Sequence, residues 1–164
     1  QSKISGDILD IGCLKGGAGF MMSYANQKGK VYMIDSFEGI IEKEKNHNKN
    51  HFIFKNIDFV KRKIKELKLK NTFVYKGIFP SSFKNKIITK KIKLCHIDVN
   101  TFRSTKKTFE YVEKRLVKNG IIVFDDYGIF SVNGVKKYVD KLMTNNKKFI
   151  FINNYMGQCI LIKK

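Results

Sequence analysis

The sequence predicts an α/β fold in which a mostly parallel β-sheet is covered by helices on both faces. Short apolar segments of strand type alternate with segments of helical periodicity along the whole 164-residue chain. The strands are apolar throughout rather than alternating, which is typical of strands buried on both faces. The length and the single unbroken pattern favour one domain over residues 1–164.

The N-terminal part is predicted to contain two strands and a helix. Residues 7–11 are short, apolar and followed by glycine, as at a strand that enters a turn. Residues 17–26 have helical character, and residues 30–34 form a second apolar run. The charged, asparagine-rich segment 42–50 shows no periodicity, so we expect a loop there.

The middle of the chain continues the same alternation. Residues 57–69 place apolar side chains on one helical face and lysines on the opposite face, which predicts an amphipathic helix. Residues 72–75 and 92–97 are short and apolar, and we expect the third and fourth strands there. The segment 77–83 between them contains the only proline and is predicted to be a loop.

A third helix is predicted over residues 104–118. Ser104 is expected to cap its start, and Asn119-Gly120 is expected to end it. Residues 121–124 follow as a strongly apolar fifth strand.

The C-terminal part is predicted to be a helix followed by a hairpin. Residues 132–143 show apolar side chains at helical spacing. Residues 149–152 and 158–162 then form two strands with no helix between them. One strand at or near an edge of the sheet must therefore be antiparallel.

Composition limits the function classes. The net charge of +19 attracts anions and suits a nucleic-acid binder, but the lysines are scattered rather than gathered in one tract, which favours ordinary solvated faces. No apolar run is long enough to span a bilayer, so we expect no membrane association. Three cysteines, Cys13, Cys95 and Cys159, make a disulfide framework improbable and favour a reducing, cytoplasmic location.

The turn after the first strand is rich in glycine. Gly12 and Gly16 are separated by three residues, and Asp10 lies two residues before Gly12. Glycines between a strand and a helix let the backbone approach a ligand closely. Leu14 occupies the place of the second glycine in a dinucleotide fingerprint, which favours a ligand without phosphates. A methionine moiety fits, with its ammonium at Asp10 and its carboxylate on the glycine amides; the alternative is a tight turn without a ligand.

The second strand ends in Asp35-Ser36-Phe37. An acid about 20 residues after the glycine turn is where a ribose diol is bound by charge-assisted hydrogen bonds. Phe37 is expected to cover an adenine ring. The alternative for Asp35 is a structural cap, but its spacing from the turn favours an adenosine-containing ligand.

The fourth and fifth strands end in acidic residues. Asp98 and Asn100 follow the fourth strand, and Asp125 and Asp126 follow the fifth. Neighbouring parallel strands bring these carboxylates together, and a cation relieves their repulsion. An all-oxygen donor set suits Mg²⁺ or Ca²⁺, and such an ion activates a substrate hydroxyl. The alternative is that one of the paired aspartates caps the turn.

Two histidines, His47 and His51, fall in the loop after the second strand. Either is a candidate general base near neutral pH, and the alternative is that both are exposed loop residues. His96 lies inside a strand and is expected to be hydrogen-bonded in the core.

Four motifs, GDILDIGCLKGG, IDSFEG, HIDVNTFRSTKKTFE and NGIIVFDDYG, resemble the macrocin O-methyltransferase family in content and order. The resemblance covers nearly the whole chain. It implies a Rossmann-like class I methyltransferase fold, with a seven-stranded sheet of order 3-2-1-4-5-7-6 whose last strand is antiparallel. The sequence departs from the family at Asn100, where the family has an acid. It also departs at the start, because the family has lid helices before the first strand and this chain begins at that strand.

The resemblance also implies ligands and roles. The expected S-adenosylmethionine site comprises Asp10, Gly12, Cys13, Gly16, Gly17, Asp35, Ser36, Phe37 and Asp98. The expected Mg²⁺ ligands are Asp98, Asp125 and Asp126. The expected catalytic residues are Asp98 and a loop histidine, His47 or His51.

The function expected from these features is O-methylation of a sugar or another small hydroxylated molecule, by a cytoplasmic enzyme that is a candidate homodimer. Two alternatives remain. The first is a methyltransferase or binding protein for nucleic acid, suggested by the charge. The second is a module that binds the cofactor without turnover.

Overall fold

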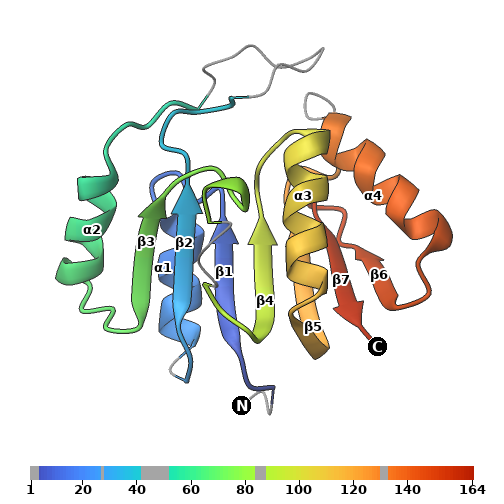
Figure 1. The fold of residues 1–164 in the computed structure, drawn as a ribbon, viewed down its shortest axis with the longest axis horizontal. Coiled ribbons are helices and arrows are strands. Elements are labelled where there is room, and N and C mark those ends of the chain that lie inside the picture. The colour runs from blue at the N-terminus through green and yellow to red at the C-terminus, as the bar shows by residue number, and fades with distance from the viewer. Residues whose placement is uncertain (1–3, 27, 42–51, 84–87, 130–132) are drawn as a thin grey trace.

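The computed structural model describes residues 4–26, 28–41, 52–83, 88–129 and 133–164. Seven strands form one sheet in the order β3-β2-β1-β4-β5-β7-β6, which is the order that the family resemblance implied (Figure 1). The strands are β1 (Asp7–Ile11), β2 (Val31–Asp35), β3 (Thr72–Lys76), β4 (Ile92–Ile97), β5 (Leu116–Phe124), β6 (Phe149–Asn153) and β7 (Cys159–Lys163). The first five strands are parallel, and β7 is antiparallel to both β5 and β6.

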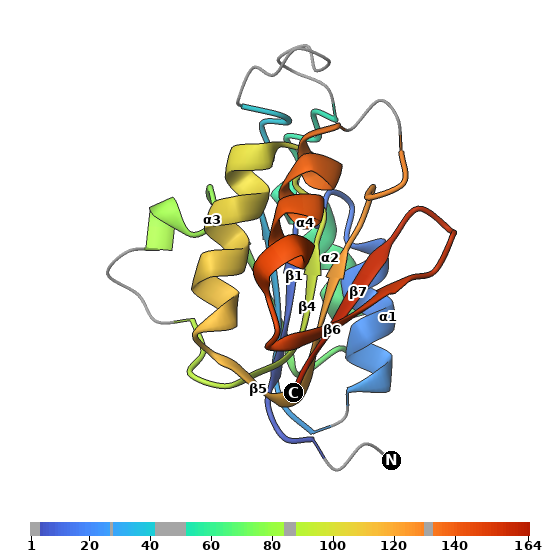
Figure 2. The same cartoon turned by 90° about the vertical axis from the view of Figure 1, so that its right-hand side faces the viewer.

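Helices lie on both faces of the sheet. They are α1 (Gly17–Ala25), α2 (Ile57–Glu66), α3 (Phe102–Glu113) and α4 (Asn133–Asn145), with a short 3₁₀ helix, η1 (Ser81–Phe83), between β3 and β4. Figure 2 shows α3 and α4 on one side of the sheet and α1 on the other. None of the helices in the described ranges is both long and apolar enough to cross a membrane.

Two apolar cores hold the layers together. The larger core joins α3 and α4 to the sheet through Phe109, Val112 and Val139. The smaller core joins α1 and α2 to β1 and β2, and includes Met33 and Val60. The three cysteines are buried and unpaired.

The register of the parallel strands aligns their carboxyl ends. Ile11 at the end of β1 lies opposite Ile34 of β2 and Ile97 of β4. The residues that follow continue the ladder, because the amides of Gly12, Asp98 and Asp125 donate to the carbonyls of Ile34, Ile11 and Ile97. The loops after β1, β2, β4 and β5 therefore start at one level, which is where ligands bind in sheets of this type.

The third helix differs from the prediction at both ends. Thr101 caps α3 by accepting a hydrogen bond from the Ser104 amide, so Ser104 is not the cap. The helix ends at Glu113, and Asn119-Gly120 lies inside β5, where the pairing with β4 shifts register. Asn119 has φ +59°, a conformation that suits a β-bulge as well as a helix end, so the same two residues fit both structures.

Candidate active site

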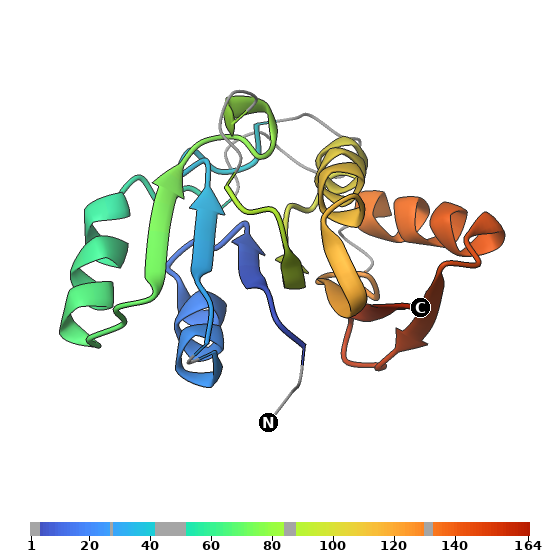
Figure 3. The same ribbon diagram turned by 60° about the horizontal axis from the view of Figure 1, so that its bottom comes forward.

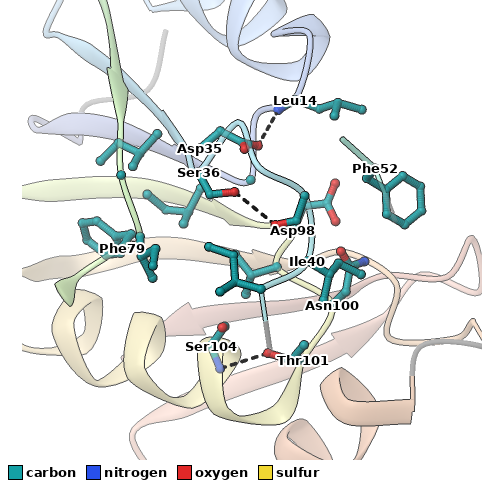
Figure 4. Close-up of a pocket in the computed structure, with 18 of the residues that line it drawn as sticks. Leu14, Asp35, Ser36, Ile40, Phe52, Phe79, Asp98, Asn100, Thr101 and Ser104 are labelled. Carbon is teal, nitrogen blue, oxygen red and sulfur yellow. Dashed lines mark hydrogen bonds between the residues drawn. The ribbon is translucent and has the colours of Figure 1, made fainter. Parts of the chain in front are cut away.

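A cavity of about 340 Å³ opens at the carboxyl ends of the strands. Asp35 and Leu14 lie at one end of it and Thr101 and Ser104 at the other (Figure 4). Its lining comes from the loops after β1, β2, β3, β4 and β5 and from the start of α3. The volume falls in the range of small-molecule sites.

The glycine turn after β1 brings two loops into close contact. Gly12 has φ +91°, and a Cβ atom at this position would lie 1.8 Å from the carbonyl oxygen of Asp98. Only glycine can fill this place, because the obstacle is backbone rather than a flexible side chain. Gly16 is also in the left-handed region, whereas a Cβ on Gly17 meets nothing within 4 Å.

Asp35 joins the glycine turn to the end of β2. Its Oδ2 accepts a hydrogen bond from the Leu14 amide at 2.8 Å (Figure 4). Its Oδ1 accepts one from the Phe37 amide at 2.6 Å. A carboxylate has about four lone-pair sites, so Asp35 can still accept hydrogen bonds from a ligand in the pocket. The side chain is therefore oriented by backbone amides while it faces the cavity.

The turn after Asp35 points its aromatic residue away from the cavity. The Ser36 hydroxyl donates to the Gly39 carbonyl and accepts from the Glu38 amide, which closes the turn. Phe37, with φ +54°, is only 1% exposed and lies in the smaller core. Phe37 does not line the cavity; the apolar wall comes instead from residues such as Ile40, Ile78 and Phe79.

Two carboxylates share the other side of the cavity. Asp98 and Asp126 both line it, and the Asn100 side-chain amide donates to Asp126 Oδ2 at 2.6 Å. Burial, together with the charges of Asp126 and Asp125, raises the pKa of Asp98 to about 7. A cation in the cavity would remove the cost of keeping Asp98 ionised.

The carboxylate of Asp125 does not face the cavity, unlike that of Asp126. Its carboxylate lies 3.5 Å from His96 Nε2 and accepts a hydrogen bond from the Gln158 side chain at 3.0 Å. These contacts, the one with His96 first, lower the pKa of Asp125. Asp125 is not part of the cavity lining, in contrast to the expectation that all three aspartates converge.

His96 is held between two acids behind the cavity. Its Nδ1 lies 2.9 Å from Oδ1 of Asp10, which is fully buried and whose Oδ2 has no hydrogen-bond partner among the described residues. Burial of His96 lowers its pKa, but the hydrogen bonds to Asp10 and Asp125 outweigh this effect and raise it to about 10. The imidazole is thus a buried cation that neutralises the two carboxylates, and Asp10 does not reach the cavity lining.

Comparison with known proteins gives these features a common explanation. The family profile described as macrocin-O-methyltransferase (TylF) matches residues 1–156. The chain belongs to the macrocin-O-methyltransferase (TylF) family. The chain is therefore a methyltransferase. The O-methyltransferase TomG from Streptomyces achromogenes, solved in complex with SAM, has a TM-score of 0.66 at 14% identity, over 96% of this chain and 73% of TomG. No curated protein matches the chain.

Solved structures with the same fold include other O-methyltransferases. The O-methyltransferase NovP has a TM-score of 0.80 at 18% identity, over 98% of this chain and 73% of NovP. The calicheamicin methyltransferase CalS11 has a TM-score of 0.77 at 15% identity, over 97% of this chain and 72% of CalS11. The O-methyltransferase from Bacillus cereus in complex with SAH has a TM-score of 0.69 at 15% identity, over 96% of this chain and 74% of that enzyme. At these identities the similarity establishes the fold.

The cavity of this TylF-family chain has groups suited to each part of S-adenosylmethionine. Asp35 retains acceptor capacity for a ribose diol. Ile40, Ile78 and Phe79 provide an apolar surface of the kind an adenine ring requires. The Gly12 turn leaves the backbone bare at the cavity.

Among the described residues, the acids near the cavity do not form the full set of three metal ligands that the sequence suggested. In the described ranges, no group of three His, Cys, Asp or Glu side chains has the geometry to hold a metal ion. Asp98, Asp126 and the oxygen of Asn100 nevertheless fit Mg²⁺, which binds through one or two carboxylates and keeps water or substrate oxygens as its other ligands. His47 and His51 lie outside the described residues, so their catalytic role stays a prediction.

Four of the nine residues expected to bind the cofactor line the cavity: Gly12, Asp35, Ser36 and Asp98. Five do not: Asp10, Cys13, Gly16, Gly17 and Phe37. Burial raises the pKa of the Cys13 thiol far above neutrality, so Cys13 has no role as a nucleophile. The sequence reasoning missed Ile40, Ile78, Phe79, Thr101 and Ser104. Ile78 and Phe79 lie in the loop that follows the third predicted strand, and this position could have indicated that they line the cavity.

The buried imidazolium predicts a loss of stability at alkaline pH. Because the pKa of His96 is raised from 6.5 to about 10 on folding, the stability it supplies is complete below pH 6.5 and is lost as the pH rises through about 10. We expect the thermal midpoint to fall between about pH 7 and 10. A His96→Gln variant should be less stable at pH 7 and should lose this slope. An unchanged slope in the variant would show that other groups cause it.

Tyr127, in the loop after β5, forms a hydrogen bond with α4. The Tyr127 hydroxyl donates to Asp140 Oδ1 at 2.8 Å, and Lys136 pairs with the same carboxylate at 2.8 Å. Removing the hydroxyl in Tyr127→Phe should lower the free energy of unfolding by about 1 kcal/mol, as for a single hydrogen bond. Urea unfolding measures this, with Tyr155→Phe as the control because Tyr155 is 91% exposed. Equal effects in the two variants would contradict the role of this contact.

Proposed function

We propose that this methyltransferase transfers the methyl group of S-adenosylmethionine to a hydroxyl of a sugar or another small molecule, with help from Mg²⁺. The observation that supports it is the single cavity that joins Asp35 and the Gly12 turn to Asp98, Asn100 and Asp126. A ribose-type acceptor site and a pair of carboxylates for a cation are thus side by side. We take residues 1–164 as one domain for this activity.

Some residues of the chain bind the cofactor, and others activate the acceptor hydroxyl. The Asp35 carboxylate accepts hydrogen bonds from the ribose hydroxyls, and the absence of a side chain at Gly12 allows the cofactor to approach the backbone. Bound S-adenosylmethionine supplies an activated methyl group. Asp98 and Asp126, with the side-chain oxygen of Asn100, would hold a divalent cation, which would lower the pKa of the acceptor hydroxyl. Fixing the hydroxyl in line with the methyl group lowers the barrier through orientation.

A sugar acceptor is supported by family membership and by the cavity size. CalS11, a structural neighbour, is described as a TDP-rhamnose 3'-O-methyltransferase. The general base for the hydroxyl proton remains His47 or His51 as a prediction from the sequence. The location in the cytoplasm and the homodimeric state also remain predictions.

Calorimetry with S-adenosylmethionine, with and without Mg²⁺, tests the cofactor and metal roles separately. We expect binding in both conditions, and methyl transfer to hydroxylated sugars only with a divalent cation. EDTA should abolish transfer, and full activity in EDTA would refute the metal role.

Asp126→Ala separates an enzyme from a module that only binds the cofactor. We expect a decrease in kcat of about 100-fold or more, because the cation loses one of its two carboxylates. Cofactor affinity and the far-ultraviolet circular dichroism should be retained. Asp58→Ala, which removes an exposed acid on α2, is the matched control. Unchanged turnover in Asp126→Ala would contradict the assigned role.

A further inference from the structure

The face of the sheet that α3 and α4 cover also carries exposed aromatic side chains, at the edge formed by β3. Strand β3 is an edge strand. Among the described residues, none of the four α-helices lies in front of β2 and β3 in Figure 1, and η1 contacts this face through Phe83. Two aromatic side chains lie there two residues apart on one face of β3. Phe73 is 38% exposed and Tyr75 is 41% exposed.

A third ring, on the neighbouring strand, holds these two rings in place. Tyr32 on β2 is buried, and its ring stacks with Phe73 at 5.7 Å and with Tyr75 at 6.4 Å, with interplanar angles of 27° in both pairs. Phe83 of η1 packs edge-on against Tyr75 at 6.3 Å. Phe73 and Tyr75 are thus preoriented aromatic surfaces that still face solvent. We call this pair the β3 aromatic pair.

The neighbouring edge of the sheet is strongly basic. Backbone hydrogen bonds place Lys30, Lys91 and Arg115 at the amino ends of adjacent strands, opposite to the cofactor cavity. Figure 3 turns this end of the sheet toward the viewer. Exposed lysines cluster in the segments that lead into these strands: Lys28, Lys30, Lys70, Lys90, Lys91 and Lys114. We call them the amino-edge lysines.

Most of this charge is not neutralised by the protein. None of the amino-edge lysines forms an ion pair with an acidic side chain within the ranges that the structure describes. The carboxylate of Asp7, at this edge, is already hydrogen-bonded to the Lys30 amide and the Thr89 hydroxyl, and that of Glu113, beside Lys114, pairs with Lys148. Lys30 itself lies 5.7 Å from the Phe73 ring centroid, so a cation directly borders the β3 aromatic pair.

We propose that the β3 aromatic pair and the amino-edge lysines form a binding surface for single-stranded nucleic acid. Successive bases stack on Phe73 and Tyr75, while the lysines contact the phosphates. Exposed rings on a sheet surface beside a basic track are the elements by which proteins bind single strands without reading sequence. A duplex does not fit, because its bases are already stacked on one another. The surface lies outside the cofactor cavity and is independent of the methyl acceptor.

Fluorescence anisotropy with a labelled oligouridylate of about 12 nucleotides, at about 50 mM salt, tests the stacking. We expect Phe73→Ala and Tyr75→Ala each to raise the Kd by about 5-fold or more. Tyr75→Phe keeps the ring and should retain binding. Tyr155→Ala, at an exposed tyrosine of the β6–β7 hairpin, should change the Kd by less than about 2-fold. Equal losses at Tyr75 and Tyr155 would overturn the proposal.

Two further arms test the partner and the charge. An abasic oligonucleotide of the same length, a duplex and heparin should bind more weakly than the oligouridylate; equal binding of any of them would show a general polyanion site and overturn stacking.

The triple variant Lys30→Gln, Lys70→Gln and Lys91→Gln should reduce the slope of log K against log salt concentration by about 2. A second triple variant, at Lys137, Lys141 and Lys147, makes the same change in net charge as a control. Equal slopes in the two triples, or no binding by the wild-type chain, would overturn the proposal.

Discussion

Replacing Gly12 by alanine is expected to prevent stable folding or to lower the free energy of unfolding by about 4 kcal/mol or more. The new Cβ would lie 1.8 Å from the Asp98 carbonyl oxygen, and φ at this position is +91°. Neither obstacle can be removed by rotating a side chain, so the β1 turn must move away from the end of β4. Urea unfolding at neutral pH measures the loss, and calorimetry with S-adenosylmethionine should show no binding.

Gly17→Ala is the matched control for this substitution. A Cβ at Gly17 meets no atom within 4 Å, and the residue begins α1 with an ordinary backbone conformation. Alanine there should leave stability unchanged or raise it by up to about 1 kcal/mol. If the two alanine variants were equally stable, the close approach of Gly12 to Asp98 would not be a feature of the folded protein.

Changing Asp35 to asparagine should weaken S-adenosylmethionine binding by about 10- to 100-fold. The asparagine has one oxygen in place of two and no charge. Its amino group would face the amide of either Leu14 or Phe37, both of which donate to Asp35 in the native protein. The ribose would therefore lose a charge-assisted acceptor, and the glycine turn would lose its tie to β2.

Isothermal titration measures this affinity, and Asp58→Asn on α2 is the control because that carboxylate is exposed and does not line the cavity. The thermal midpoint of Asp35→Asn should fall by only a few degrees, because the side chain is partly exposed. A normal affinity in Asp35→Asn would mean that the ribose is not bound here.

The positions of the strands and helices along the chain were predictable because hydrophobic periodicity reports directly on burial, whereas the order of the strands in the sheet came from the resemblance to the macrocin O-methyltransferase family. The strands 7–11 and 92–97 were predicted with the bounds that β1 and β4 have in the structure. Asn119-Gly120 misled the prediction of α3, because a left-handed asparagine serves a helix end and a β-bulge equally well. Only the pairing of β5 with β4 decides between them, and that pairing is a long-range contact.

The site was harder to predict because side-chain direction depends on tertiary contacts. Spacing from the glycine turn was enough to place Asp35 at the cavity. Spacing did not reveal that Phe37 turns into the smaller core or that His96 attracts Asp10 and Asp125. Those outcomes depend on the space behind the sheet and on which residue of β4 lies next to β1, and neither is a local property of the chain.

The divergence of Asp125 and Asp126 affects how this chain tolerates genetic change. Asp125 is engaged with His96 and Gln158 behind the cavity, whereas Asp126 faces the cavity beside Asn100. Under the function proposed above, selection for a foldable chain acts on the first position, and selection for turnover acts mainly on the second. A descendant that gave up catalysis would still need Asp125 for folding, whereas the residue at position 126 would be constrained by its left-handed φ of +59° and its contact with Asn100 rather than by turnover.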